Sequence, residues 1–72
     1  MTNAIYKNAI AANIAALAQR LSDAAALAEE ATTAMEDGNQ NQAIGTILEF
    51  EQLLPEAQAL FNAAIALHRS HA

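Results

Sequence analysis

The chain has 72 residues, enough for one small domain, and 54% of them are hydrophobic, many of these alanine. Alanine buries little area and the chain has no cysteine, so we expect self-association rather than disulfides or thiolate metal sites to stabilise the fold. A net charge of −5 argues against nucleic acid and anionic membrane surfaces as ligands, and no apolar run is long enough to span a membrane. Because the residues from Met1 to Ala4 do not resemble the start of a secretion signal, we expect a cytoplasmic protein.

The first half of the chain has the apolar spacing of one long helix, predicted over about residues 3–37. Apolar residues recur at alternating intervals of four and three, which is the heptad pattern of a helix that packs along its length on another helix. The predicted contact column is Ile10, Ile14, Leu17, Leu21, Ala24, Ala28, Ala31 and Met35. Its later residues are small, so a neighbouring helix can approach more closely there.

A tight turn is predicted at about residues 38–39. Gly38 suits the position after a helix end, because glycine adopts a left-handed backbone conformation without steric cost. Asn39 can cap the next helix, and Gln42 stands three residues later, where a capping-box partner would be.

The second helix is predicted over about residues 40–70. Its contact column again alternates four and three: Ala43, Ile47, Phe50, Leu54, Ala57, Phe61, Ala64 and His68. Pro55 removes one backbone hydrogen bond and predicts a kink at that position. Alternatively Pro55 begins a third helix, but the unbroken heptad spacing favours one kinked helix.

These patterns predict an all-α fold, an antiparallel hairpin of two helices. Leu53, Leu60 and Leu67 form a further column beside the predicted contact and would stay exposed in a single hairpin. We therefore expect a homodimer, a four-helix bundle with these three leucines at the dimer interface. We expect the two hairpins to run antiparallel, because parallel hairpins would gather the acidic residues of both chains at one end.

The sequence contains no recognisable catalytic constellation. His68 and His71 are spaced so that they could share a metal ion, but a facing Glu-x-x-His pattern is absent, because residue 65 is isoleucine. The serines and threonines have no activating partner at a suggestive spacing, and no glycine-rich phosphate loop is present. We expect no enzymatic activity and no cofactor or metal, and we interpret the two histidines as part of a polar C-terminus.

Charge is distributed unevenly along the chain. All eight acidic residues lie between residues 23 and 56, and no lysine or arginine lies in that interval. Seven-residue spacing places Asp23, Glu30 and Asp37 on one helix face, with Glu29 and Glu36 beside them. This face either keeps the chain soluble or binds a basic partner. In the second case we expect Glu29, Glu30, Glu36 and Asp37 to be the partner-binding residues.

Two families of helical proteins share part of this pattern. From Gly38 to Pro55 the chain resembles one tetratricopeptide repeat, with Gly38, Ala43, Ile47 and Pro55 at characteristic positions. Ala34 stands where that repeat has a large aromatic residue, and 72 residues cannot hold the three units that such a stack needs. In architecture the chain also resembles the dimeric RNA-binding hairpin that controls plasmid copy number, but it lacks that family's basic surface.

In length, hairpin pattern and acidic character, the whole chain is similar to small helical hairpins that phages encode to disable host proteins. It looks most like the anti-activator type, which binds a quorum-sensing transcription activator and can also bind a pilus-assembly ATPase. The resemblance implies an inhibitor that binds a host DNA-binding regulator and blocks its binding to DNA, but it transfers no residue roles. The alternative function is a structural oligomerisation module or helical adaptor without an inhibitory role.

Overall fold

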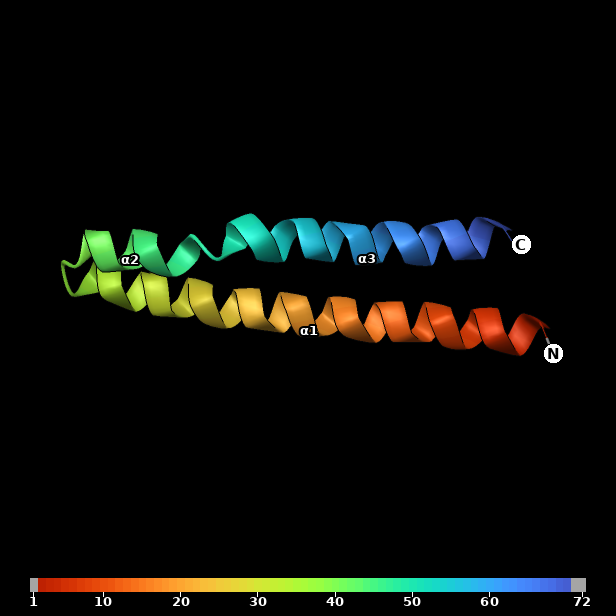
Figure 1. Ribbon diagram of the computed structural model, residues 1–72. Coiled ribbons are helices and arrows are strands. Elements are labelled where there is room, and N and C mark those ends of the chain that lie inside the picture. Colours follow the sequence, from red (N-terminus) through yellow and green to blue (C-terminus); the bar gives the residue numbers. More distant parts are fainter. Residues whose placement is uncertain (1, 71–72) are drawn as a thin grey trace.

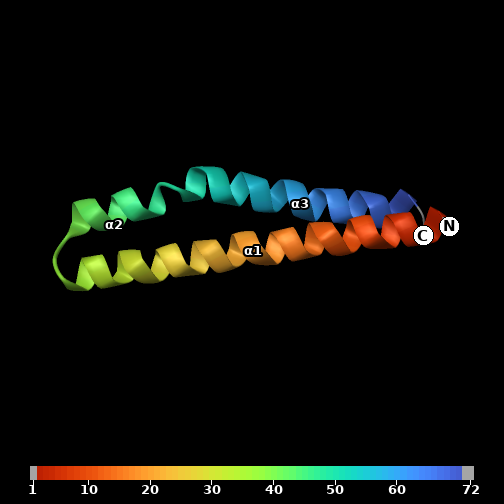
Figure 2. The ribbon, with the colours of Figure 1, turned by 60° about the horizontal axis from the view of Figure 1, so that its bottom comes forward.

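The computed structural model describes residues 2–70, which form a narrow helical hairpin (Figure 1). Its helices are α1 (Thr2–Glu36), α2 (Gln40–Ile47) and α3 (Phe50–Ser70). α1 runs antiparallel to α2 and α3 and lies beside both, so the start of α1 and the end of α3 share one end of the molecule (Figures 1 and 2). The hairpin measures 56 × 14 × 13 Å. The predicted all-α hairpin is therefore confirmed, with a second arm that is bent.

Gly38 ends α1 as the sequence predicts. Its φ is +82°, and the amides of Gly38 and Asn39 donate to the carbonyls of Met35 (3.0 Å) and Ala34 (2.8 Å). These two bonds are the Schellman arrangement, which satisfies carbonyl groups at a helix C-terminus. Asn39 is the N-cap residue of α2, as predicted, but its side chain makes no capping hydrogen bond, so only the position of the cap is confirmed. Its backbone (φ −102°, ψ 68°) departs from the usual cap geometry.

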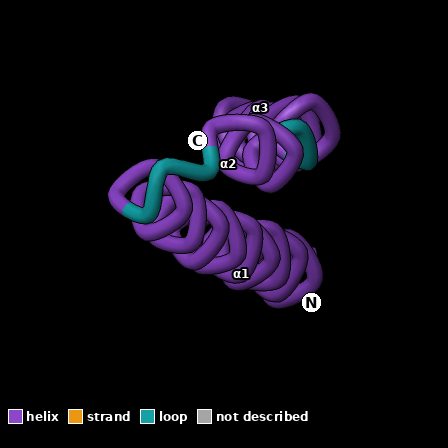
Figure 3. The backbone as a smooth tube through the Cα atoms, turned by 90° about the vertical axis from the view of Figure 1, so that its left-hand side faces the viewer, coloured by secondary structure: helices purple, strands orange, loops and turns teal. Residues whose placement is uncertain are grey.

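The second arm is interrupted at Leu48–Glu49, one to two turns before Pro55 (Figure 3). There the amides of Glu51 and Gln52 donate to carbonyls three residues back instead of four. In a regular helix the ring of a proline would crowd the carbonyl four residues earlier, which for Pro55 is that of Glu51, and this favours a break in the turns before Pro55. The bend thus lies upstream of the predicted position. Pro55 lies inside α3, and it does not begin a helix.

Half of the residues of α1 that face the other arm are those predicted. At every second position, the residue that faces the other arm is the one immediately before the predicted residue. The residues that are buried or half-buried there are Ile10, Asn13, Leu17, Arg20, Ala24, Leu27, Ala31 and Ala34. In α2 and α3 they include Ala43, Thr46, Phe50, Leu53, Ala57, Leu60, Ala64 and Leu67. The predicted contacts Ile14, Leu21 and Met35 are exposed instead, as are Ile47, Leu54, Phe61 and His68.

The hairpin encloses almost no core. Its buried residues, within the part that the structure describes, are all alanines: Ala24, Ala31, Ala34, Ala43, Ala57 and Ala64. Three of them, Ala31, Ala34 and Ala43, form one cluster near the tip, where small side chains let the helices approach closely. No large side chain among the described residues is fully buried. Burial within one hairpin is therefore shallow.

Candidate functional site: two faces of the hairpin

Five acidic residues lie on one long side of the hairpin, which we call the acidic face. On the first arm they are Asp23 and Glu30, which directly precede inner residues of α1, and Asp37, which lies just beyond the end of α1. On the other arm they are Glu49 and Glu56. Each lies next to the inner column of its own arm. In an antiparallel pair of helices, residues that occupy the same flanking heptad position on the two helices lie on the same side of the pair. Asp23, Glu49 and Glu56 line one open depression of about 480 Å³. Glu30 and Asp37 line a second, of about 350 Å³, nearer the tip.

The structure divides the four predicted partner-binding residues into two pairs. Glu30 and Asp37 lie on the acidic face, in the depression that Thr33, Thr46 and Gln42 also line. Glu29 and Glu36 lie on the outer surface of α1, and they do not line that depression. All four are exposed and can contact a partner without a change in the hairpin. The sequence did not predict that Glu49 and Glu56 join them on this face.

Arg20 is the cation of the acidic face. Its Nε lies 3.0 Å from Oε1 of Glu56, which links α1 to α3. The Nε atom is buried but makes no hydrogen bond, so the contact is an ion pair without hydrogen-bond geometry. Both side chains are more than a third exposed (38% and 41%), so the pair stabilises the hairpin by less than about 1 kcal/mol. The pair places Arg20 and Glu56 at the same level of the hairpin.

The opposite long side, which we call the apolar face, carries six large hydrophobic residues. They are Ile14, Leu21 and Met35 on α1, and Ile47, Leu54 and Phe61 on α2 and α3. Each is between 38% and 54% exposed. They lie side by side in two columns, because residues that follow the inner columns in an antiparallel pair share one side. The hairpin thus presents a continuous hydrophobic surface to solvent.

The predicted dimer-interface residues Leu53, Leu60 and Leu67 lie elsewhere. They belong to the inner column of α3 and are half-buried, so the expectation that they stay exposed in one hairpin is wrong. The reason is a one-residue rotation of the helix: Leu53 packs inward and its neighbour Leu54 points outward. Dimerisation itself stays a prediction, but these leucines already contribute to the fold of a single chain.

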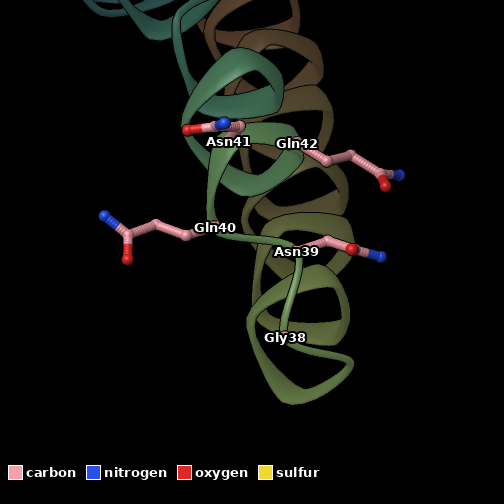
Figure 4. Close-up of a pocket in the computed structure, with 5 residues that line it drawn as sticks. All are labelled: Gly38, Asn39, Gln40, Asn41 and Gln42. Carbon is pink, nitrogen blue, oxygen red and sulfur yellow. The ribbon is translucent and has the colours of Figure 1, made fainter.

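The described residues provide no convergent polar site. Within residues 2–70, no three His, Asp or Glu side chains are placed to hold a metal ion. His68 is exposed near the end of α3, and His71 lies outside the described residues. At the tip, a polar depression is lined by residues 38–42, but its amide side chains do not converge on one point (Figure 4). Those of Asn39 and Gln42 extend to one side of the chain, and those of Gln40 and Asn41 extend to the other. None of the three helices has the length and hydrophobicity that crossing a membrane requires.

Comparison with known proteins identifies no relative of this chain. No protein-family model, curated protein or solved structure matches it. The functional interpretation therefore depends on the two faces described above.

Proposed function

We propose that this protein is a non-enzymatic, dimeric inhibitor that binds a basic surface of another protein through its acidic face. The observation that carries the proposal is the segregation of charge: five acidic side chains line one side of a rigid rod, and the apolar face lies on the other. Such an arrangement creates a one-signed potential that steers and orients a basic partner.

The partner class that we favour is a DNA-binding regulator. A DNA-binding surface carries the clustered lysine and arginine side chains that neutralise phosphates, and an acidic rod competes for the same charges. Occupying that surface would block DNA binding without any chemical reaction. A phage inhibitor of a host transcription activator is the specific form of this proposal, and it comes from the resemblance described above.

The second candidate is a structural oligomerisation module. It is favoured by the exposed hydrophobic residues of the apolar face, which a single hairpin does not cover. In that case the acidic face only keeps the assembly soluble.

A pair of variants with equal net charge distinguishes the two candidates. The test variant replaces four residues of the acidic face: Glu30 and Glu49 by Gln, and Asp23 and Asp37 by Asn. The control adds four lysines at exposed positions on the outer surface: Asn8, Ala15, Ser22 and Asn62. Both raise the net charge from −5 by the same amount. Each protein is used to capture partners from a bacterial lysate, and the captured protein is then tested for DNA binding.

The inhibitor proposal predicts that the unchanged protein and the control capture the same basic protein and prevent it from binding DNA. The test variant should fail to capture it. The complex of the unchanged protein should dissociate as the salt concentration approaches 1 M, where the Debye length falls to about 3 Å. Equal capture by the test variant would refute the acidic-face mechanism. A captured protein that still binds DNA would refute inhibition of DNA binding.

A further inference from the structure

We infer that the apolar face is covered by a second copy of the hairpin, packed face to face and antiparallel, with Leu21 and Leu54 near the centre of the interface. This inference specifies the dimer proposed above and is independent of the acidic face.

A single hairpin exposes more surface than a compact monomer does. The chain exposes 5258 Å², whereas a folded monomer of its mass, 7.6 kDa, exposes about 4,300 Å². Two hairpins that became as compact as a typical protein of twice the mass would bury about 3,400 Å² in total. That area falls in the range of obligate homodimers, about 2,000–5,000 Å². The excess exposed surface is therefore of the size that a stable dimer buries.

Each hairpin places polar residues inside and leaves larger hydrophobic residues outside. In α1 the inner column includes Asn13 and Arg20, while the adjacent Ile14 and Leu21 are exposed. A hairpin that acted alone would gain more by turning the larger hydrophobic residues inward. Helices with three apolar columns out of seven are typical of bundles, where each helix contacts two neighbours. The exposed column of α1 is thus suited to a second helix contact.

The apolar face carries few charged residues. On α1, the strip formed by the exposed column and its outer neighbour carries no charged residue between Ala11 and Met35. The five residues of the acidic face lie on the opposite side, so two copies can join through their apolar faces without burying them. On α3, Glu51 lies at the outer edge of the corresponding strip and is exposed. A highly charged partner would find little to pair with on this face, whereas a second copy matches it.

Twofold symmetry then limits the arrangement. Two hairpins stacked face to face can be related by an axis across the helices, which makes them antiparallel and places α1 over α1 of the partner. They can also be related by an axis along the helices, which makes them parallel and places α1 over α3 of the partner. The parallel form brings the acidic tips of both chains together. The antiparallel form separates them, so we infer that one.

The centre of the interface follows from the register of the arms. The ion pair between Arg20 and Glu56 shows that Leu21 and Leu54 lie at about the same level. Large apolar residues lie on both sides of this level along the face. An antiparallel axis near it brings Leu21 of the two chains close together, and Leu54 likewise.

Sedimentation equilibrium at micromolar concentration tests the inference with matched variants. The test variant is Leu21→Lys with Leu54→Lys. The control is Ile5→Lys with Leu48→Lys, whose leucine and isoleucine are also exposed but lie off the apolar face. We expect dimers for the unchanged protein and the control, and a helical monomer for the test variant. A second variant, Leu21→Ala with Leu54→Ala, should weaken dimerisation by about a thousandfold, because the dimer buries four half-exposed leucines.

Two results would overturn the inference. A monomeric unchanged protein would exclude a second copy as the occupant and would also remove the dimer from the proposed function. A test variant that remains dimeric would show that the chains associate through another surface, and the dimer would survive. If the lysine variant does not fold, an unchanged dimer affinity in the alanine variant would overturn the inference in the same way. Capture of a basic protein through the acidic face is measured separately and depends on neither result.

Discussion

Leu53 and Leu54 are adjacent in sequence but lie on different surfaces, so truncating each to alanine separates folding from association. Leu53 is half-buried against α1, and full burial of a leucine is worth about 1.5–3 kcal/mol, so Leu53→Ala should cost about 1–1.5 kcal/mol within one hairpin. Leu54 is 52% exposed in the hairpin, and its truncation there should cost less than about 0.5 kcal/mol. If a second copy covers Leu54, its loss adds a cost comparable to that of Leu53.

Urea unfolding followed by circular dichroism at two protein concentrations measures both contributions. For a dimer, raising the concentration about a hundredfold stabilises the folded state by about 2.7 kcal/mol. We expect both variants to unfold at lower urea than the unchanged protein, with a midpoint that rises with concentration. The reasoning would be refuted if the unchanged protein shows no concentration dependence and Leu54→Ala leaves its midpoint unchanged.

Three further predictions concern the tip, the bend and the orientation of the dimer. Gly38→Ala should lower the free energy of unfolding by about 1 kcal/mol, because the φ angle of Gly38 is +82°. Gly45 lies in a helix with open space around an added carbon, so Gly45→Ala should raise the free energy of unfolding by up to about 1 kcal/mol. Urea unfolding of both variants measures these changes. Pro55→Ala should extend the helix through Leu48–Glu49 and stabilise the hairpin by up to about 3 kcal/mol, which a larger circular dichroism signal and a higher urea midpoint would show; an unchanged helical signal would contradict our explanation of the bend. A spin label at Gln40→Cys should report a tip-to-tip distance of about 45 Å, because about 15 helical residues separate the tip from the axis near Leu21, and a distance of about 20 Å would indicate parallel hairpins.

The sequence predicted the helices and the turn of this fold, but it did not predict the rotation of each helix about its own axis. Heptad spacing and Gly38 were sufficient to predict two antiparallel arms and the turn between them. The rotation could not be predicted, because two columns of α1 lie beside Ile10 and Leu17, and the more hydrophobic one contains Ile14 and Leu21. Hydrophobicity alone selects that column for the inner contact. The hairpin instead places Asn13 and Arg20 there.

The same rotation explains why the four predicted partner-binding residues lie on two surfaces of the hairpin. The acidic positions on α1 were correctly grouped by their seven-residue spacing, but Glu49 and Glu56 could join them only once the register of the arms was known. Arg20 offered a signal, since a cation on one arm level with an acid on the other favours an ion pair. Leu54 and Phe61, which directly follow Leu53 and Leu60 in the sequence, were predicted to face the other arm because the rotation of the helix was not known; both are exposed.

Small-angle X-ray scattering of the unchanged protein at micromolar concentration tests the central claim that two hairpins associate side by side along their length. A single hairpin has a mass of 7.6 kDa and a Cα radius of gyration of 16.5 Å. Stacking two hairpins about 10 Å apart doubles the mass but raises the radius of gyration only to about 17 Å. We predict this combination. A mass of 7.6 kDa, or a doubled mass with a radius of gyration of about 30 Å from end-to-end association of the 56 Å rods, would contradict it.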